Sequence, residues 1–230
     1  MKKIAAILAI LVLVVSLSYG QDIVQGPSAG DKGVLFSFSG LANLGAGTYQ
    51  GGFGAKYYLS DFMAIRGILQ LALASQTIPA NPAPGQASSN GSKSGNSFGL
   101  GGAIEVHLAK SRISPYIGGG ILFSTTSTES KNAVVGGTVQ GTTKNALNGE
   151  IVNGASFQGG TAFMIGGVAG VEYYITNGVS LSAEYQIGFN SFSQKDEEQS
   201  SGAATTTRKG GSGSSIGIST AGSLILAVYF

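Results

Sequence analysis

Charged side chains within the strand-like segments are the residues whose types and spacing could do chemistry. Two bases, three acids and the single histidine stand at alternate positions, opposite apolar neighbours: Lys56, Arg66, Glu105, His107, Glu172 and Glu184. Because side chains alternate between the two faces of a β-strand, these six share the face opposite the apolar one. Five of them, all but the histidine, lie about three to five residues from a tight turn. We therefore expect these five side chains to lie at similar depths within one interior.

Two interpretations of this set remain open. Buried charges persist only when they are paired, and two cations facing three acids and a histidine can pair. The set is then a plug of ion pairs that fills an interior. Alternatively, Glu105, His107 and Glu184 form a path for protons or ions.

Eight segments must position these residues, and each alternates apolar with small or polar residues at a period of two. They span about residues 33–40, 49–59, 63–74, 97–108, 115–124, 159–175, 179–192 and 215–230. The last is the clearest, with Leu224, Leu226, Val228 and Phe230 on one face.

Aromatic residues near the segment ends are expected to form two interfacial girdles: Tyr57, Tyr173, Tyr229 and Phe230 in one, and Tyr49, Phe98, Phe123, Phe163, Phe189 and Phe192 in the other. Tyr229 falls on the inward face, so an interior position is the alternative for it.

The connections between the segments alternate in length. The second, fourth and sixth are tight turns, whereas the third, fifth and seventh are long and polar, covering residues 75–96, 125–158 and 193–214. Residues 75–96 hold three of the five prolines, which predicts a flexible loop and excludes a central strand. Within the fifth connection, residues 133–139 and 149–157 alternate weakly, which predicts a hairpin that extends the wall.

The N-terminus has the pattern of an export signal. A basic start precedes an apolar run of 12 residues from Ile4 to Val15, too short to span a bilayer of about 30 Å, and small residues precede Gln21. We therefore expect a cleaved signal peptide over 1–20, a loose periplasmic lead-in over 21–32, and one domain over 33–230.

The composition is unusual for a soluble domain. After the expected cleavage, 11 basic residues balance 11 acidic ones, so nucleic acid is not an expected partner. The chain has no cysteine, 38 glycines, only 10% charged residues and a mean hydropathy of +0.24. No segment after residue 20 has 18 consecutive apolar residues, so no transmembrane helix is expected. This composition favours a barrel with lipid outside and a filled interior.

The export signal, the eight alternating segments, the tight turns opposite long loops and the ending Leu224–Phe230 resemble the small bacterial outer-membrane β-barrel family that includes the OmpA transmembrane domain and OmpX. The resemblance implies an all-β, eight-stranded antiparallel up-and-down transmembrane β-barrel, present as a monomer in outer-membrane lipid and lipopolysaccharide. It also implies that Leu224, Leu226, Val228 and Phe230 form the signal that the barrel assembly machinery reads. Because the pattern ends at the last strand, a peptidoglycan-binding domain like that of OmpA is not expected.

The function expected from this resemblance is a structural or surface-interaction role, with residues 75–96, 125–158 and 193–214 as the places for an extracellular ligand. The alternative is a narrow pore, or a conduit for small or hydrophobic solutes as in OmpW-like relatives, with the outward Gly167 and Gly222 permitting lateral opening. A soluble lipocalin-like barrel would instead turn its apolar faces inward.

An enzyme is not expected. Small barrels that act on lipid A use a histidine with a serine and an acid, but His107 lies at the end expected to be periplasmic, away from the outer leaflet. One histidine with scattered acids lacks the spacing of a metal site. The glycines at 99–102 and 118–120 lack the lysine and the following helix of a phosphate loop, so no cofactor is expected.

Overall fold

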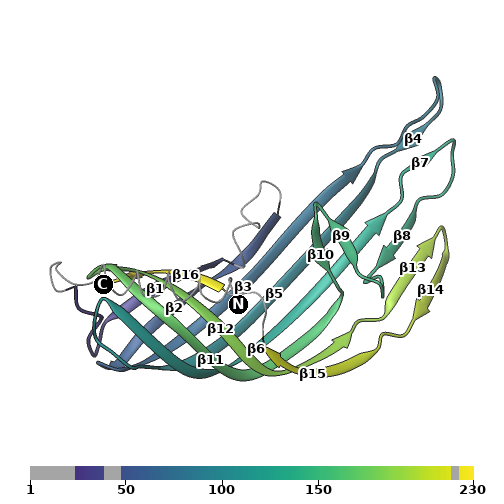
Figure 1. Ribbon diagram of the computed structural model, residues 1–230. Coiled ribbons are helices and arrows are strands. Elements are labelled where there is room, and N and C mark those ends of the chain that lie inside the picture. The colour runs from purple at the N-terminus through teal and green to yellow at the C-terminus, as the bar shows by residue number, and fades with distance from the viewer. Residues whose placement is uncertain (1–23, 39–47, 219–222) are drawn as a thin grey trace, which may run out of the picture.

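The computed structural model describes residues 24–38, 48–218 and 223–230, and its eight wall strands close into a barrel (Figure 1). In chain order the wall consists of β1 (Lys32–Phe38), β2 (Thr48–Ser60), β3 (Met63–Ile78), β5 (Gly91–His107), β6 (Ile113–Lys131), β11 (Gly160–Thr176), β12 (Val179–Gln194), and a last strand made of β15 (Ser212–Ile218) and β16 (Ser223–Tyr229). Each strand is antiparallel to its neighbours, and β16 pairs with both β12 and β1, which closes the ring. The predicted eight-stranded up-and-down barrel is confirmed. No helix in the described ranges is long and apolar enough to cross a membrane.

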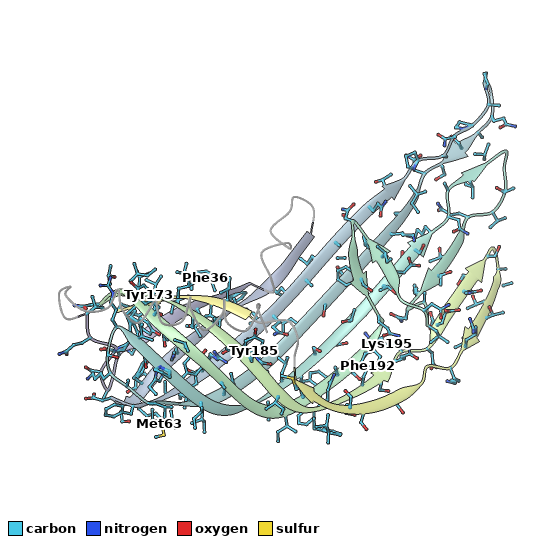
Figure 2. All side chains as sticks on the ribbon, in the orientation of Figure 1. Phe36, Met63, Tyr173, Tyr185, Phe192 and Lys195 are labelled. Atoms are coloured by element: carbon cyan, nitrogen blue, oxygen red, sulfur yellow. The ribbon has the colours of Figure 1, made fainter. Side chains whose placement is uncertain are left out.

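The outer face of the wall carries the large apolar side chains. Exposed outward residues include Phe36, Leu100, Ile104, Ile121, Ile165, Leu181 and Ile187, and Figure 2 shows Phe36, Met63, Tyr173 and Tyr185 among the outward side chains. In water this surface would be unfavourable at about 25 cal/mol per Å², whereas lipid removes that cost. The distribution is that of a barrel embedded in lipid and the reverse of a lipocalin-like one.

Two of the aromatic residues lie inside the barrel. Phe192 stands on the inward face of β12, where its ring leaves no room for a side chain at Gly160. Its predicted place in a girdle is therefore wrong. Tyr229 is 8% exposed and takes the interior alternative. For both residues the reason is strand parity, because Phe192 shares the inward face with Asn190 and Gln194, and Tyr229 shares it with buried Ile225 and Ala227.

The wall strands β3, β5 and β6 continue beyond the start of β11, at the end that we call the loop end (Figure 1). β3 and β5 remain paired from Ser75 opposite Ser94 to Ile78 opposite Gly91. The prediction of a loop over 75–96 is therefore wrong for 75–78 and 91–96. Polar side chains do not prevent an antiparallel ladder, and the three prolines are confined to the link 79–90, which also holds β4 (Ser88–Ser89).

The fifth connection also differs from the prediction. The wall is extended by β8 (Gly141–Lys144), which pairs with the end of β6 and with β13 (Glu197–Ser201), and β13 in turn pairs with β14 (Ala204–Arg208). Residues 133–139 and 149–157 do not form a hairpin with each other. Positive φ angles of 74° and 78° at Gly136 and Gly137 turn the chain directly after β7 (Val134–Val135), which pairs with β4. β9 (Glu150–Val152) and β10 (Ala155–Phe157) form a separate small hairpin.

The N-terminal segment 24–31 packs against the opposite end of the barrel, which we call the turn end. Gly26 and Pro27 are buried, and a Cβ atom at Gly26 would lie 3.0 Å from the Tyr174 ring. The Gly30 amide donates to the Tyr58 carbonyl (2.8 Å), and the Tyr58 amide donates to the Asp31 carbonyl (3.0 Å). A loose lead-in is therefore the wrong description of residues 24–31. The predicted signal peptide, 1–20, lies outside the described residues.

Asp61 ties this segment to two turns and predicts a pH dependence. Its carboxylate lies 2.9 Å from Lys110 Nζ and accepts a hydrogen bond from the Ala29 amide (3.1 Å). The hydrogen bond from Lys110 first, and the Ala29 amide second, lower the pKa of Asp61 below 3.8. A carboxyl whose pKa is depressed by folding stabilises the fold above its unfolded pKa, and this contribution disappears as the pH falls through the folded pKa.

We therefore expect the Ala29 amide resonance to titrate with a midpoint below 3.8, and to lose this titration in Asp61→Asn. NMR spectra recorded across the acid range in detergent micelles measure both. A midpoint at or above 3.8 would contradict the contact.

Candidate functional site

The six predicted charged residues come together in the lumen near the turn end. Alternation along each strand turns them inward, and strand pairing places them side by side: Lys56 lies directly opposite Arg66 across β2 and β3, and Glu105 lies opposite Ala64. All six are at most 5% exposed: Lys56, Arg66, Glu105, His107, Glu172 and Glu184. We call this set the charged layer.

A continuous chain of ion pairs crosses the charged layer. Glu105 lies between the two cations, 2.8 Å from Lys56 Nζ and 2.9 Å from Arg66 Nη1. Lys56 also reaches Glu172 (3.0 Å), and Arg66 reaches Glu184 with both terminal nitrogens (2.9 and 3.3 Å). Two cations directly opposite each other would repel, and Glu105 between them removes that cost. The order across the lumen is therefore acid, base, acid, base, acid.

Hydroxyl groups complete the layer, and the sequence pattern did not assign them to it. Tyr229 and Ser180 both donate to Glu172, and Tyr116 donates to Glu184 (3.0 Å). Tyr58, Tyr116 and Tyr174 are each at most 2% exposed. Their inward parity and their closeness to the tight turns were the signal that could have identified them. These hydroxyl donors occupy lone pairs of Glu172 and Glu184, whereas Glu105 contacts the layer through its ion pairs with Lys56 and Arg66.

His107 is held in one orientation by a serine from the next turn. The Ser114 hydroxyl donates to the Ala109 carbonyl (2.7 Å), so its oxygen accepts from the N–H at Nδ1 of His107 (2.9 Å). This network assigns the tautomer. Nε2 lies 3.2 Å from Tyr58 Oη and 3.6 Å from Glu105. A serine, a histidine and an acid thus meet, but the Ser114 hydrogen points to a carbonyl and not to the histidine.

A small cavity lies beside the charged layer. It measures about 40 Å³, and Arg66, Gln70, Leu122, Met164 and Gln186 are among the residues that line it. A buried water needs about 10–15 Å³, so the cavity has room for water but not for an organic ligand. Among the described residues no group of three or more His, Cys, Asp or Glu side chains could hold a metal ion.

The other predicted site residues lie apart from the layer. The Phe230 side chain is 75% exposed, and its backbone pairs with Lys32 through two hydrogen bonds (2.9 and 3.2 Å). Its role in recognition by the assembly machinery stays a prediction, as do the roles of Leu224, Leu226 and Val228. The three predicted ligand loops contribute strands at the loop end, where β8 and β13 continue the sheet beyond β6.

No family model and no curated protein sequence matches this chain. Solved structures similar to it include the N-terminal β-barrel domain of Pseudomonas aeruginosa OprF, with 14% identity over 89% of this chain and 100% of that one and a TM-score of 0.38. Neisserial surface protein A has 16% identity over 90% and 96%, with a TM-score of 0.38. The outer membrane protein OprG from Pseudomonas aeruginosa has 10% identity over 89% and 98%, with a TM-score of 0.42.

The chain is a small eight-stranded antiparallel β-barrel. This conclusion comes from its own strand pairing, which returns from β16 to β1. The likeness to these solved structures concerns the fold alone, and we infer no activity or ligand for this barrel from them. What the barrel does must be argued from its lumen and its surface.

Proposed function

We propose that the chain is a bacterial outer-membrane β-barrel with a closed lumen and a structural or surface-interaction role. The observation that carries this is the charged layer, a buried chain of ion pairs from Glu172 to Glu184. An eight-stranded barrel is only wide enough for side chains to fill it. Segment 24–31 adds a second closure at the turn end. A barrel closed in this way acts through its surface, not through its lumen.

The sidedness of the barrel supports the second part of the proposal. The tight turns, segment 24–31 and Phe230 lie at one end, which is the periplasmic end of an exported barrel with short turns inside and long loops outside. The loop end then faces the exterior, where β5, β6, β8, β13 and β14 make a continuous sheet. This sheet is the surface that we propose for an extracellular ligand, with outer-membrane lipid and lipopolysaccharide around the wall below it.

A conduit for small or hydrophobic solutes is the second candidate, favoured by a groove on the outer wall. The groove measures about 840 Å³, is lined by Gly102 and Gly119, and is rimmed by Leu100 and Phe123. Its floor is closed, because β6 and β11 pair without interruption from Gly160 to Tyr173, through Gly167 opposite Gly119. Lateral opening at Gly167 therefore has no support in this arrangement, and Gly222 lies outside the described residues.

The proposal also includes the absence of enzymatic activity. A nucleophilic serine must donate its hydrogen to the base that activates it. The Ser114 hydroxyl donates to the Ala109 carbonyl instead, and the residue is 1% exposed.

Conductance in a planar lipid bilayer tests the closed lumen. We expect purified, refolded wild-type protein to show no channels. The variants Glu105→Ala and Arg66→Ala then show which barrier seals the lumen. If these variants conduct, the charged layer is the seal; if they do not conduct, the structures at the two ends of the barrel are the seal. Steady wild-type channels would refute the closed lumen and make transport the leading function.

A further inference from the structure

The β9–β10 hairpin folds into the barrel mouth at the loop end. Its neighbours are Ala72, Ala74 and Gly95, which occupy inward positions of β3 and β5 at the same strand parity as Arg66 and Glu105. The hairpin therefore lies on the inner surface of the wall. Figure 1 shows β9 and β10 beside the long strands, below the outermost elements of the loop end.

An apolar seat holds the hairpin there. Val152 is fully buried, and Phe157 is 4% exposed and packs with Ala74 and Ala155. The Phe157 ring lies directly on the backbone of Gly95, because any side chain at that position would collide with it. Glycine at 95 is thus explained by the close approach of the ring and not by the backbone, whose φ is not positive. The wall contains a hollow that fits this phenylalanine.

Three polar contacts latch the hairpin to the wall. Lys93 Nζ lies 2.9 Å from Glu150, Asn153 Nδ2 donates to the Ser75 carbonyl (2.7 Å), and the Asn153 amide donates to Gln76 (3.3 Å). All three lie near the rim. In the described ranges β9 and β10 form a two-stranded sheet of their own, with no ladder to the wall. The hairpin can therefore leave the wall by breaking side-chain contacts, without unzipping a barrel strand.

The ends of the hairpin have the geometry of a hinge. On one side Leu147 is fixed, since its amide donates to Glu197 (2.8 Å) and its carbonyl accepts from Gln194 (3.1 Å). Gly149 follows with a φ of 74°, a conformation that glycine adopts without strain. On the other side Gly159 precedes the wall strand β11, and its carbonyl accepts from the Lys195 amide (3.1 Å), so this end is fixed as Leu147 is. Residues 150–158 lie between these two fixed points, so rotation at Gly149 and about the N–Cα bond of Gly159 would move them as one unit.

We propose that residues 149–159 form a lid that closes the extracellular mouth of the lumen and opens as a unit about Gly149 and Gly159. The lid is a barrier separate from the charged layer, and it keeps large solutes out of the upper lumen. That this mouth is extracellular rests on the proposed function; the movement of the lid does not.

Cysteine accessibility tests the lid, because the chain has no cysteine of its own. Ala74→Cys places a thiol under the hairpin, where Ala74 is 6% exposed, and Ser92→Cys places one on the exposed face of the same extension. Both are labelled with a membrane-impermeant maleimide in proteoliposomes. With the native hairpin we expect Cys at 74 to react at least about tenfold more slowly than Cys at 92, and Phe157→Ser to remove most of this difference.

Ile151→Ser is the matched control, because Ile151 lies in the same hairpin but is 65% exposed, away from the seat. It should leave the protection unchanged. If Phe157→Ser does not refold, the double substitution Lys93→Ala with Asn153→Ala removes two anchors and should also speed labelling. Equal labelling of the two thiols under the native hairpin, or full protection after the seat or latches are removed, would overturn the lid. A conducting wild type would refute the closed lumen without altering these labelling rates.

Discussion

Replacing Arg66 by methionine will lower the free energy of unfolding by about 3–5 kcal/mol, the usual cost of removing one partner from a buried ion pair. Arg66 contacts Glu105 (2.9 Å) and Glu184 (2.9 and 3.3 Å) and is 5% exposed. Methionine keeps much of the side-chain volume but no charge. Glu105 and Glu172 would then share Lys56, and Glu184 would keep the Tyr116 hydroxyl and the Gln186 amide but lose its cation.

Glu105→Gln should cost less than Arg66→Met, although Glu105 stands at the centre of the layer. After that change Lys56 retains Glu172 (3.0 Å) and Arg66 retains Glu184 (2.9 Å), so each cation still has one carboxylate. The charge balance of the layer, and not the central position of the residue within it, sets the order of the two variants.

Urea unfolding in lipid vesicles, followed by far-ultraviolet circular dichroism because the chain has no tryptophan, measures both effects. The matched control is Lys131→Met, which removes an exposed ion pair with Glu129 (2.9 Å) and should cost at most about 1 kcal/mol. If Arg66→Met proved no more costly than Lys131→Met, the ion pairs would not hold the layer together.

Alanine at two adjacent glycines of β6 should have opposite effects. Gly118 faces the lumen, and a Cβ atom there would collide with the Ile104 carbonyl oxygen and lie 3.0 Å from Val168. The neighbouring strands would have to separate, which typically costs about 1–3 kcal/mol. Gly119 faces lipid, and the nearest atom to a Cβ there is the Gly166 carbonyl oxygen at 3.6 Å, an ordinary contact.

Gly119→Ala should therefore be neutral or stabilising by about 0.4–1 kcal/mol, since alanine restricts the unfolded chain and the backbone is compatible with it. The urea midpoints of the two variants and the wild type, measured in the same vesicles, compare their stabilities directly. Equal destabilisation by both would mean that β6 requires glycine for its backbone and not for close packing inside the barrel.

The wall of the barrel could be predicted because alternation is a local property. Inward Arg66 and outward Ile65 are distinguished by their neighbours two positions away, and the same parity placed all six charged residues on one side. Segment boundaries were less predictable. Three prolines with several Ser, Asn and Gly residues suggested a loop at 75–96, yet the ladder between β3 and β5 includes 75–78 and 91–96.

The partners within the lumen could not be predicted in the same way. Lys56 meets Glu172 across 116 residues of chain and Arg66 meets Glu184 across 118. Such pairs depend on the register of every intervening strand and on closure of the ring. Tyr58 and Tyr116 join the layer for the same reason, because only their height in the closed barrel brings them to His107 and Glu184.

The period-two pattern was thus sufficient for an eight-stranded barrel with an apolar outer face and a charged interior. It was sufficient because a few consecutive residues of one strand distinguish its apolar face from its polar face. Only the tertiary structure decided which acid neutralises which base, that segment 24–31 packs against the turn end, and that the β9–β10 hairpin turns inward onto Gly95. These outcomes depend on space inside a closed ring, and that space exists only after the distant strands have paired.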